Sequence, residues 1–91
     1  MELRLKNYGT IEITNATSAD GGDILIEAAD RFEGLAKTTD YEITDVYLCE
    51  YDCVWALVAW LDVPEDTWDT EDAIVFEIEN QDAVYKLNAR L

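Results

Sequence analysis

The fold of this chain is constrained most by one apolar run, Val54–Leu61, which reads Val-Trp-Ala-Leu-Val-Ala-Trp-Leu. Its β-branched and aromatic residues favour a strand, and a helix is the competing interpretation for so short a run. A predicted tight turn at residues 50–52 precedes the run. Both faces of such a strand are apolar. We therefore predict a central strand, or one whose second face is covered by another surface.

Alternating apolar and polar residues predict further strands on either side of this run. Residues 3–13 alternate about a turn at residues 7–9, where Asn and Gly tolerate positive φ. The resulting hairpin would bring Arg4 and Lys6 near Glu12.

Two later segments, residues 41–51 and 74–79, alternate as well, and a phase slip at Asp45-Val46 indicates a β-bulge. Residues 84–91 predict a last strand, which pairs with residues 74–79 across a turn at 80–82.

Residues 24–37 carry the clearest helical pattern. Apolar side chains recur there at the spacing of one helix face, and Glu27 and Arg31 form an i,i+4 pair on the other face. We expect this segment to be the main helix. Together the patterns predict an α+β fold for residues 1–91, a small single domain with an antiparallel sheet of about five or six strands packed against one main helix.

The charge excludes several classes of partner. Twenty-one acidic residues face six basic ones, for a formal net charge of −15. Such a chain repels nucleic acid and anionic membrane, so we expect neither as a direct ligand and expect a basic protein partner instead. A general gain in solubility, or adaptation to high salt, is the alternative reason for the charge.

Residues 1–6 lack the pattern of a signal peptide, and the longest charge-free run, residues 53–61, is too short to span a membrane. We therefore expect a cytoplasmic protein, in the host cytoplasm if it is phage-encoded.

The residue types argue against an enzyme. The chain has no histidine, its one serine, Ser18, has no evident base, and Gly21-Gly22 lacks the residues of a phosphate-binding loop. Paired carboxylates cleave glycosides in other proteins, but so small a domain offers little room for a sugar cleft. We predict no catalytic residue and no cofactor.

No metal site is predicted either. Calcium loops read from Asp62 or from Asp66 lack the glycine that the sixth position needs. Cys49 and Cys53 without histidine make a poor zinc site and are expected to be reduced, buried thiols. A disulfide between them needs a tight turn at residues 50–52, because on one continuous strand they would lie about 13 Å apart.

The most acidic segment, residues 62–72, is the predicted partner-binding surface. Six of its eleven residues are carboxylates and none is basic. In a helix or in an extended strand, its acids would form a row with a spacing of about 5–7 Å, comparable to phosphates along a nucleic-acid strand. Trp68 would be an aromatic anchor within this row, or else would fold back onto the core. The alternative interpretation of the acids is a solvated loop. The candidate partner-binding residues are Asp62, Glu65, Asp66, Trp68, Asp69, Glu71 and Asp72, together with Glu50 and Asp52 of the neighbouring turn.

In its size, its acidity and its α+β plan the chain resembles the small acidic inhibitors of phages and mobile elements, which include DNA-mimic anti-CRISPR and anti-restriction proteins. Residues 55–58, Trp-Ala-Leu-Val, are also similar to a short strand of the phage-encoded inhibitors of uracil-DNA glycosylase, another DNA-mimic family. The resemblance implies cytosolic action without a cofactor and tight binding to a basic nuclease or DNA-recognition complex.

The expected function is therefore inhibition by occupancy. Carboxylates would take the place of phosphates and block the nucleic-acid-binding site of a host defence nuclease or surveillance complex. Two alternatives remain open. One is an acidic adaptor or structural protein, monomeric or oligomeric, in which a partner or a second copy covers the second face of Val54–Leu61. The other is a plain domain with a salt-adapted surface.

Overall fold

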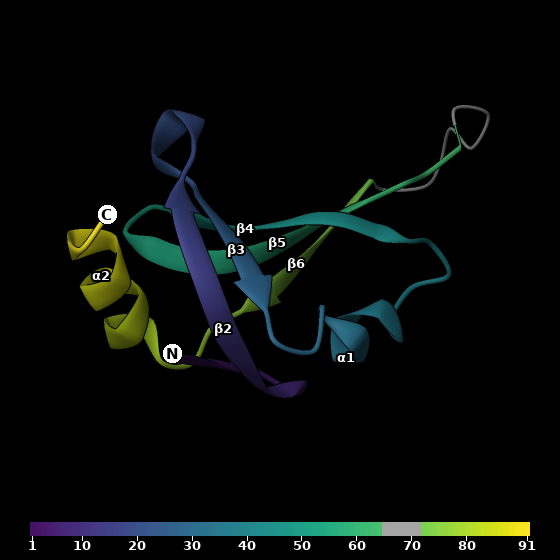
Figure 1. Cartoon of the computed structure of the whole chain (residues 1–91), viewed down its shortest axis with the longest axis horizontal. Coiled ribbons are helices and arrows are strands. Elements are labelled where there is room, and N and C mark those ends of the chain that lie inside the picture. Colours follow the sequence, from purple (N-terminus) through teal and green to yellow (C-terminus); the bar gives the residue numbers. More distant parts are fainter. Residues whose placement is uncertain (65–71) are drawn as a thin grey trace.

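The computed structural model describes residues 1–64 and 72–91. Within them the chain forms one six-stranded sheet in which every neighbouring pair is antiparallel and the spatial order follows the chain. The strands are β1 (Glu2–Leu5), β2 (Gly9–Ser18), β3 (Ile24–Ala28), β4 (Ile43–Tyr51), β5 (Val54–Leu61) and β6 (Ala73–Glu77). The short helix α1 (Glu33–Ala36) joins β3 to β4, and α2 (Gln81–Ala89) follows β6 (Figure 1). The predicted α+β class with six strands and one longer helix is confirmed.

The sheet curls until its first strand meets the chain that leaves its last strand. Leu5 bridges Ile78, the Lys6 N–H donates to the Glu77 carbonyl at 3.0 Å, and the Glu79 N–H donates to the Arg4 carbonyl at 2.7 Å. The concave side of this half-barrel holds the hydrophobic core, which no polar or charged residue enters among the described residues. Its fully buried side chains include Leu3, Leu5, Ile24, Val46, Leu48, Leu57 and Val84.

The first hairpin forms as predicted, with Leu3 opposite Ile11. Its charges pair differently, however. Glu12 accepts the N-terminal ammonium at 3.2 Å, and Lys6 reaches Glu77 at 3.4 Å. The curl of the sheet explains the second pair, because it brings the end of β6 beside β1, far from it in the sequence.

The prediction of a main helix over residues 24–37 is wrong. Ile24–Ala28 is the strand β3, which pairs with β2 along its whole length. Ile24, Ile26 and Ala28 are buried while Glu27 is exposed, which is the period of two expected for a strand. The helical spacing that misled the prediction belongs to a different set, Leu25, Ala28, Ala29 and Phe32, which shares only Ala28 with these buried strand positions. Pairing with β2, a tertiary contact, selects the strand.

Only the last part of that segment is helical. Arg31 and Phe32 have φ of 54° and 61°, so the backbone turns sharply through two left-handed residues before α1 begins at Glu33. Leu35 of α1 is buried in the core, as the helical pattern predicted for its apolar face.

The prediction of a last strand over residues 84–91 is also wrong, because Gln81–Ala89 forms α2. Val84 is fully buried, and Leu87, three residues later, packs against the core. This i,i+3 pair gives the helix its buried side. The predicted turn at residues 80–82 is where α2 begins.

Two adjacent side chains attach α2 to the sheet. Asn80 accepts the Arg4 N–H at 2.8 Å and donates to the Glu2 carbonyl at 2.9 Å, so it binds β1. Gln81 accepts the Trp55 N–H at 2.8 Å and donates to the Trp55 and Ile78 carbonyls at 2.7 and 2.9 Å, so it binds β5. The pairing of β6 with β5 ends at Ala56, and the side-chain amide of Gln81 binds the backbone of the next β5 residue, Trp55, in place of a β6 residue.

The β4–β5 hairpin confirms that Val54–Leu61 is a strand preceded by a tight turn. The turn lies later than the predicted residues 50–52, because Glu50 and Tyr51 still pair in β4, Tyr51 lies opposite Val54, and Asp52 and Cys53 form the turn. A register shift does occur near the expected bulge at Asp45-Val46, but it lies just before it, between Ile43 and Asp45. Both turn residues have positive φ, 50° at Asp52 and 66° at Cys53, as a tight hairpin turn requires. The two cysteines stay unbridged. Cys49 is buried as expected, but the expectation that Cys53 is buried is wrong, because Cys53 belongs to the exposed turn.

Candidate protein-binding surface

The described ends of the acidic segment lie together at one end of the sheet. The Leu61 N–H donates to the Asp72 carbonyl at 2.8 Å, and the Asp62 N–H donates to the Glu42 carbonyl at 2.9 Å. β4, β5 and β6 therefore place the exposed residues Glu42, Asp62 and Asp72 side by side. Glu42 was not among the predicted residues. The other predicted residues of the segment, namely Glu65, Asp66, Trp68, Asp69 and Glu71, lie outside the described residues.

Glu50 and Asp52 lie at the opposite end of the same hairpin. Glu50 lies in β4 just before the turn and Asp52 is a residue of the turn itself, from which β5 begins, whereas Asp62 follows the last residue of β5. Seven steps of strand separate the two ends, roughly 23 Å at the usual rise per residue. Glu50 also lies opposite Trp55, so it shares the face of a buried core residue. The structure thus separates these two acids from Asp62 and Asp72.

Few of the surface acids are neutralised within the chain. Among residues 1–64 and 72–91, two ion pairs form, and they engage Glu12 and Glu77. The remaining carboxylates of these ranges are exposed, apart from the half-buried Asp23. The surface therefore keeps a strong negative potential that a basic partner can satisfy.

The convex face of β4, β5 and β6 is apolar, which is the second unusual feature of the surface. Successive rows across the three strands place Tyr47 beside Val58 and Val75, and Asp45 beside Trp60 and Ala73. Val58 is buried by its neighbours, but Val75 is 61% exposed and Trp60 is 41% exposed. A large apolar area with an acidic edge is typical of a surface that contacts another protein.

Sequence reasoning foresaw this face only for β5. β4 and β6 contribute to the apolar convex face because the pairing register aligns their outward-facing residues with those of β5. Alternation in residues 41–51 and 74–79 was the available signal, but it does not say which strands are neighbours.

Cys49 lies on the same convex face, opposite Ala56. Burial and, after it, the neighbouring Asp23 carboxylate together raise the pKa of its thiol to about 11. Cys49 in turn raises the pKa of Tyr51. A thiol with so high a pKa stays protonated near neutral pH, so Cys49 behaves as a packed apolar group and not as a nucleophile.

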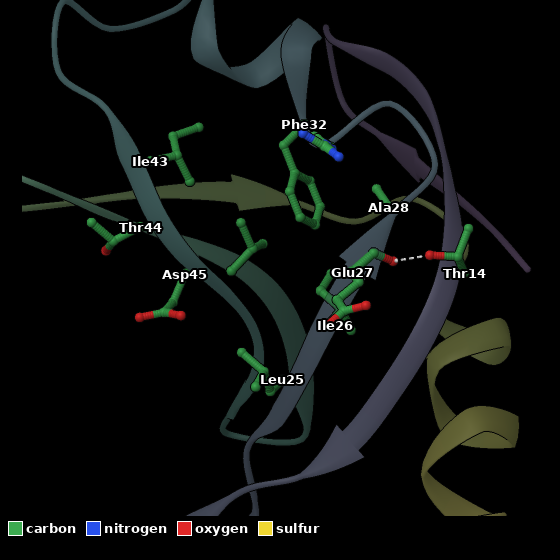
Figure 2. A pocket seen from close by; sticks show the side chains of 11 residues that line it. Thr14, Leu25, Ile26, Glu27, Ala28, Phe32, Ile43, Thr44 and Asp45 are labelled. Carbon is green, nitrogen blue, oxygen red and sulfur yellow. Dashed lines mark hydrogen bonds between the residues drawn. The ribbon is translucent and has the colours of Figure 1, made fainter.

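A cleft opens between β3 and β4, next to this face. The two strands pair only at Ile24–Leu48 and Leu25–Tyr47, and beyond these pairs they diverge (Figure 2). The resulting cleft has a volume of about 440 Å³ and is lined by residues of β3, of β4 and of the connection between them. The sequence contained no sign of this cleft, because the cleft exists only where the hydrogen-bonded pairing of β3 with β4 ends.

Within the described ranges, no group of three or more His, Cys, Asp or Glu side chains is arranged to hold a metal ion. None of the helices in these ranges is long and apolar enough to cross a membrane. The chain matches no protein-family model, no curated protein and no solved structure.

Proposed function

We propose that this protein is a non-enzymatic inhibitor of the anti-CRISPR or anti-restriction type, which presents a nucleic-acid-like acidic surface to the basic nucleic-acid-binding site of a nuclease or surveillance complex in the host cytoplasm. The observation that carries the proposal is the uncompensated charge. The chain has a formal net charge of −15, and in its described part only two carboxylates form ion pairs.

The arrangement of the acids supports a surface role. No charged residue of the described ranges is buried, so these carboxylates are accessible to a partner and are not consumed in holding the fold together. Asp62 and Asp72 lie beside Glu42, next to the ends of β5, β6 and β4, so a third carboxylate joins the two described acids of the segment. Lysine and arginine rows that bind phosphates can bind such carboxylates in the same way.

The test is a capture experiment with a charge-matched control. The wild type is compared with a variant in which the six acids of residues 62–72 are changed to Asn or Gln. The control variant carries six amides on exposed acids elsewhere, so that its net charge is the same. Its substituted residues are Glu2, Asp20, Asp30, Glu33, Glu79 and Asp82.

We expect the wild type and the control to retain a nucleic-acid-binding complex from bacterial lysate, and the 62–72 variant to lose it. Added DNA or RNA should compete, and retention should fall steeply with salt because the contact is electrostatic. Equal retention by all three folded proteins, or a partner that nucleic acid does not displace, would show that the protein is not a mimic.

The exposed convex face favours a second candidate function, that of an adaptor or of a subunit of an oligomer. Tyr51 and Val54 are 58% and 56% exposed, and they extend the apolar area of Trp60 and Val75. Sedimentation over a range of protein concentrations separates the two forms. A constant monomer mass rules out the oligomer and leaves a heterologous partner for this face.

A further inference from the structure

The cleft between β3 and β4 is lined by apolar and by polar side chains, and its half-buried apolar residues are Leu25, Phe32 and Ile43. Ile26 and Val46 point to the concave side of the sheet, where they are almost fully buried, and the Phe32 side chain extends into the gap between the two strands (Figure 2). Phe32 is held there by the two left-handed residues of the turn before α1. Its ring is only partly buried, so one part of it remains open to the cleft.

The mouth of the cleft is acidic. Glu27 and Asp45 lie on opposite strands, and strand alternation places both on the convex side, away from the buried Ile26 and Val46. Neither carboxylate forms an ion pair among the described residues. Arg31 is the basic residue that lines the cleft, and it belongs to the connection at the wide end, where β3 has ended.

We propose that this cleft is a binding site for one large apolar side chain, carried by an extended segment of a basic protein in which Lys or Arg residues flank it. The apolar side chain enters between β3 and β4 and packs on Phe32. The flanking cations meet Glu27 and Asp45 at the mouth. The site lies on the convex face that β4, β5 and β6 continue, so a partner seated on that face reaches the cleft.

Size and charge select this occupant. A volume of about 440 Å³ lies within the range of about 300–1,000 Å³ that is typical of ligand sites, and it is ample for an aromatic side chain. A second copy of this chain is a poor occupant, because each copy carries a formal net charge of −15 and would bring acids toward Glu27 and Asp45. An acidic peptide is excluded for the same reason. The choice of a basic protein as the source of the segment rests on the proposed function.

The test uses the full chain and short synthetic peptides, followed by amide chemical shifts. The probe is an acetylated and amidated Gly-Lys-Phe-Lys-Gly peptide. One control peptide carries Ala in place of Phe, and another carries Glu in place of both Lys. We expect the probe to give saturable shifts confined to the cleft, around Ile26, Phe32 and Val46, and both controls to give none.

Two protein variants test the charged mouth. Glu27→Gln with Asp45→Asn removes both carboxylates without changing side-chain size, and binding of the probe should weaken by about two- to tenfold, as expected for two exposed ion pairs. Glu2→Gln with Asp82→Asn makes the same change of charge away from the cleft and should leave binding within twofold of the wild type, with screening as the cause of any small change.

The proposal is overturned if millimolar probe shifts no cleft residue, if the Glu peptide binds as well as the Lys peptide, or if both double variants weaken binding equally. These outcomes are distinct from failure of the proposed function. If the peptide binds in the cleft but no nucleic-acid-binding complex is captured, the peptide-binding site stands and the inhibitor function is rejected. If capture depends on residues 62–72 but the peptide does not bind, the inhibitor function stands and the peptide-binding site is rejected.

Discussion

Replacing Gln81 with Ala should destabilise the whole fold, because this one side chain joins α2 to β5 of the sheet. It makes three hydrogen bonds of 2.7–2.9 Å, two to the backbone of Trp55 and one to the Ile78 carbonyl. A typical hydrogen bond contributes about 0.5–1.5 kcal/mol net, so the three together contribute about 2–4 kcal/mol. The free energy of unfolding of a small domain is only about 5–15 kcal/mol, so this loss is a large fraction of the total stability.

The measurement is urea unfolding followed by circular dichroism. We expect a lower midpoint with an unchanged slope, since the surface exposed on unfolding stays the same, and a fall in Tm of at least about 8 °C. Gln81→Glu keeps the acceptor for the Trp55 N–H but sets a carboxylate oxygen against the Trp55 and Ile78 carbonyls, so it should destabilise the fold at least as much as Gln81→Ala. Asn88→Ala, an exposed change on the same helix, is the matched control and should be neutral.

A loss of less than about 0.5 kcal/mol for Gln81→Ala would refute the reasoning, because that is the scale of an ordinary surface substitution. It would mean that water replaces the side-chain amide at the Trp55 backbone. The attachment of α2 would then depend on the burial of Val84 alone.

Three further predictions concern charge and thiols. The free energy of unfolding should fall as pH rises from 9.0 to about 11, because the pKa of the Cys49 thiol is 9.0 in the unfolded chain and about 11 in the folded one. The loss is at most about 1.4 kcal/mol per pH unit. Urea titrations of Cys49→Ala should not show this loss, whereas those of Cys53→Ala should. In the native protein a thiol reagent should label the exposed Cys53 quickly and the buried Cys49 only on unfolding; equal labelling rates, read by mass spectrometry, would contradict the burial of Cys49. The free energy of unfolding should rise between low salt and about 1 M NaCl, where the screening length falls to about 3 Å and repulsion among the acids is relieved. A flat salt dependence would show that this repulsion does not limit stability.

The sequence errors have a common cause. Residues 24–37 and 84–91 were assigned by counting local periodicity, and each segment carries both periods. Leu25, Ala28 and Ala29 have a helical spacing while Ile24, Ile26 and Ala28 alternate as in a strand, and Tyr85, Leu87 and Ala89 alternate while Val84 and Leu87 have a helical spacing. In each case the choice was made by a contact with a distant segment. β3 is selected by its ladder with β2, and α2 by the bonds of Asn80 and Gln81 to β1 and β5.

The candidate site divides in the same way. The sequence predicted that the surface is acidic and that β5 is apolar on both faces, and both are properties of neighbouring residues. It did not predict that Glu50 and Asp52 lie far from Asp62, or that Glu42 lies beside it. These placements follow from the hairpin register, which sets the direction of each strand.

The sequence by itself determined the net charge, the α+β class and the Val54–Leu61 strand with its preceding turn. These depend on composition and on alternation along the chain, which remain the same in any arrangement of the strands. Only the tertiary structure decided the curl of the sheet, the place of α2, the apolar convex face and the cleft between β3 and β4. Each of these features depends on how far the hydrogen-bonded pairing between two strands extends. Packing between residues far apart in the sequence sets that extent.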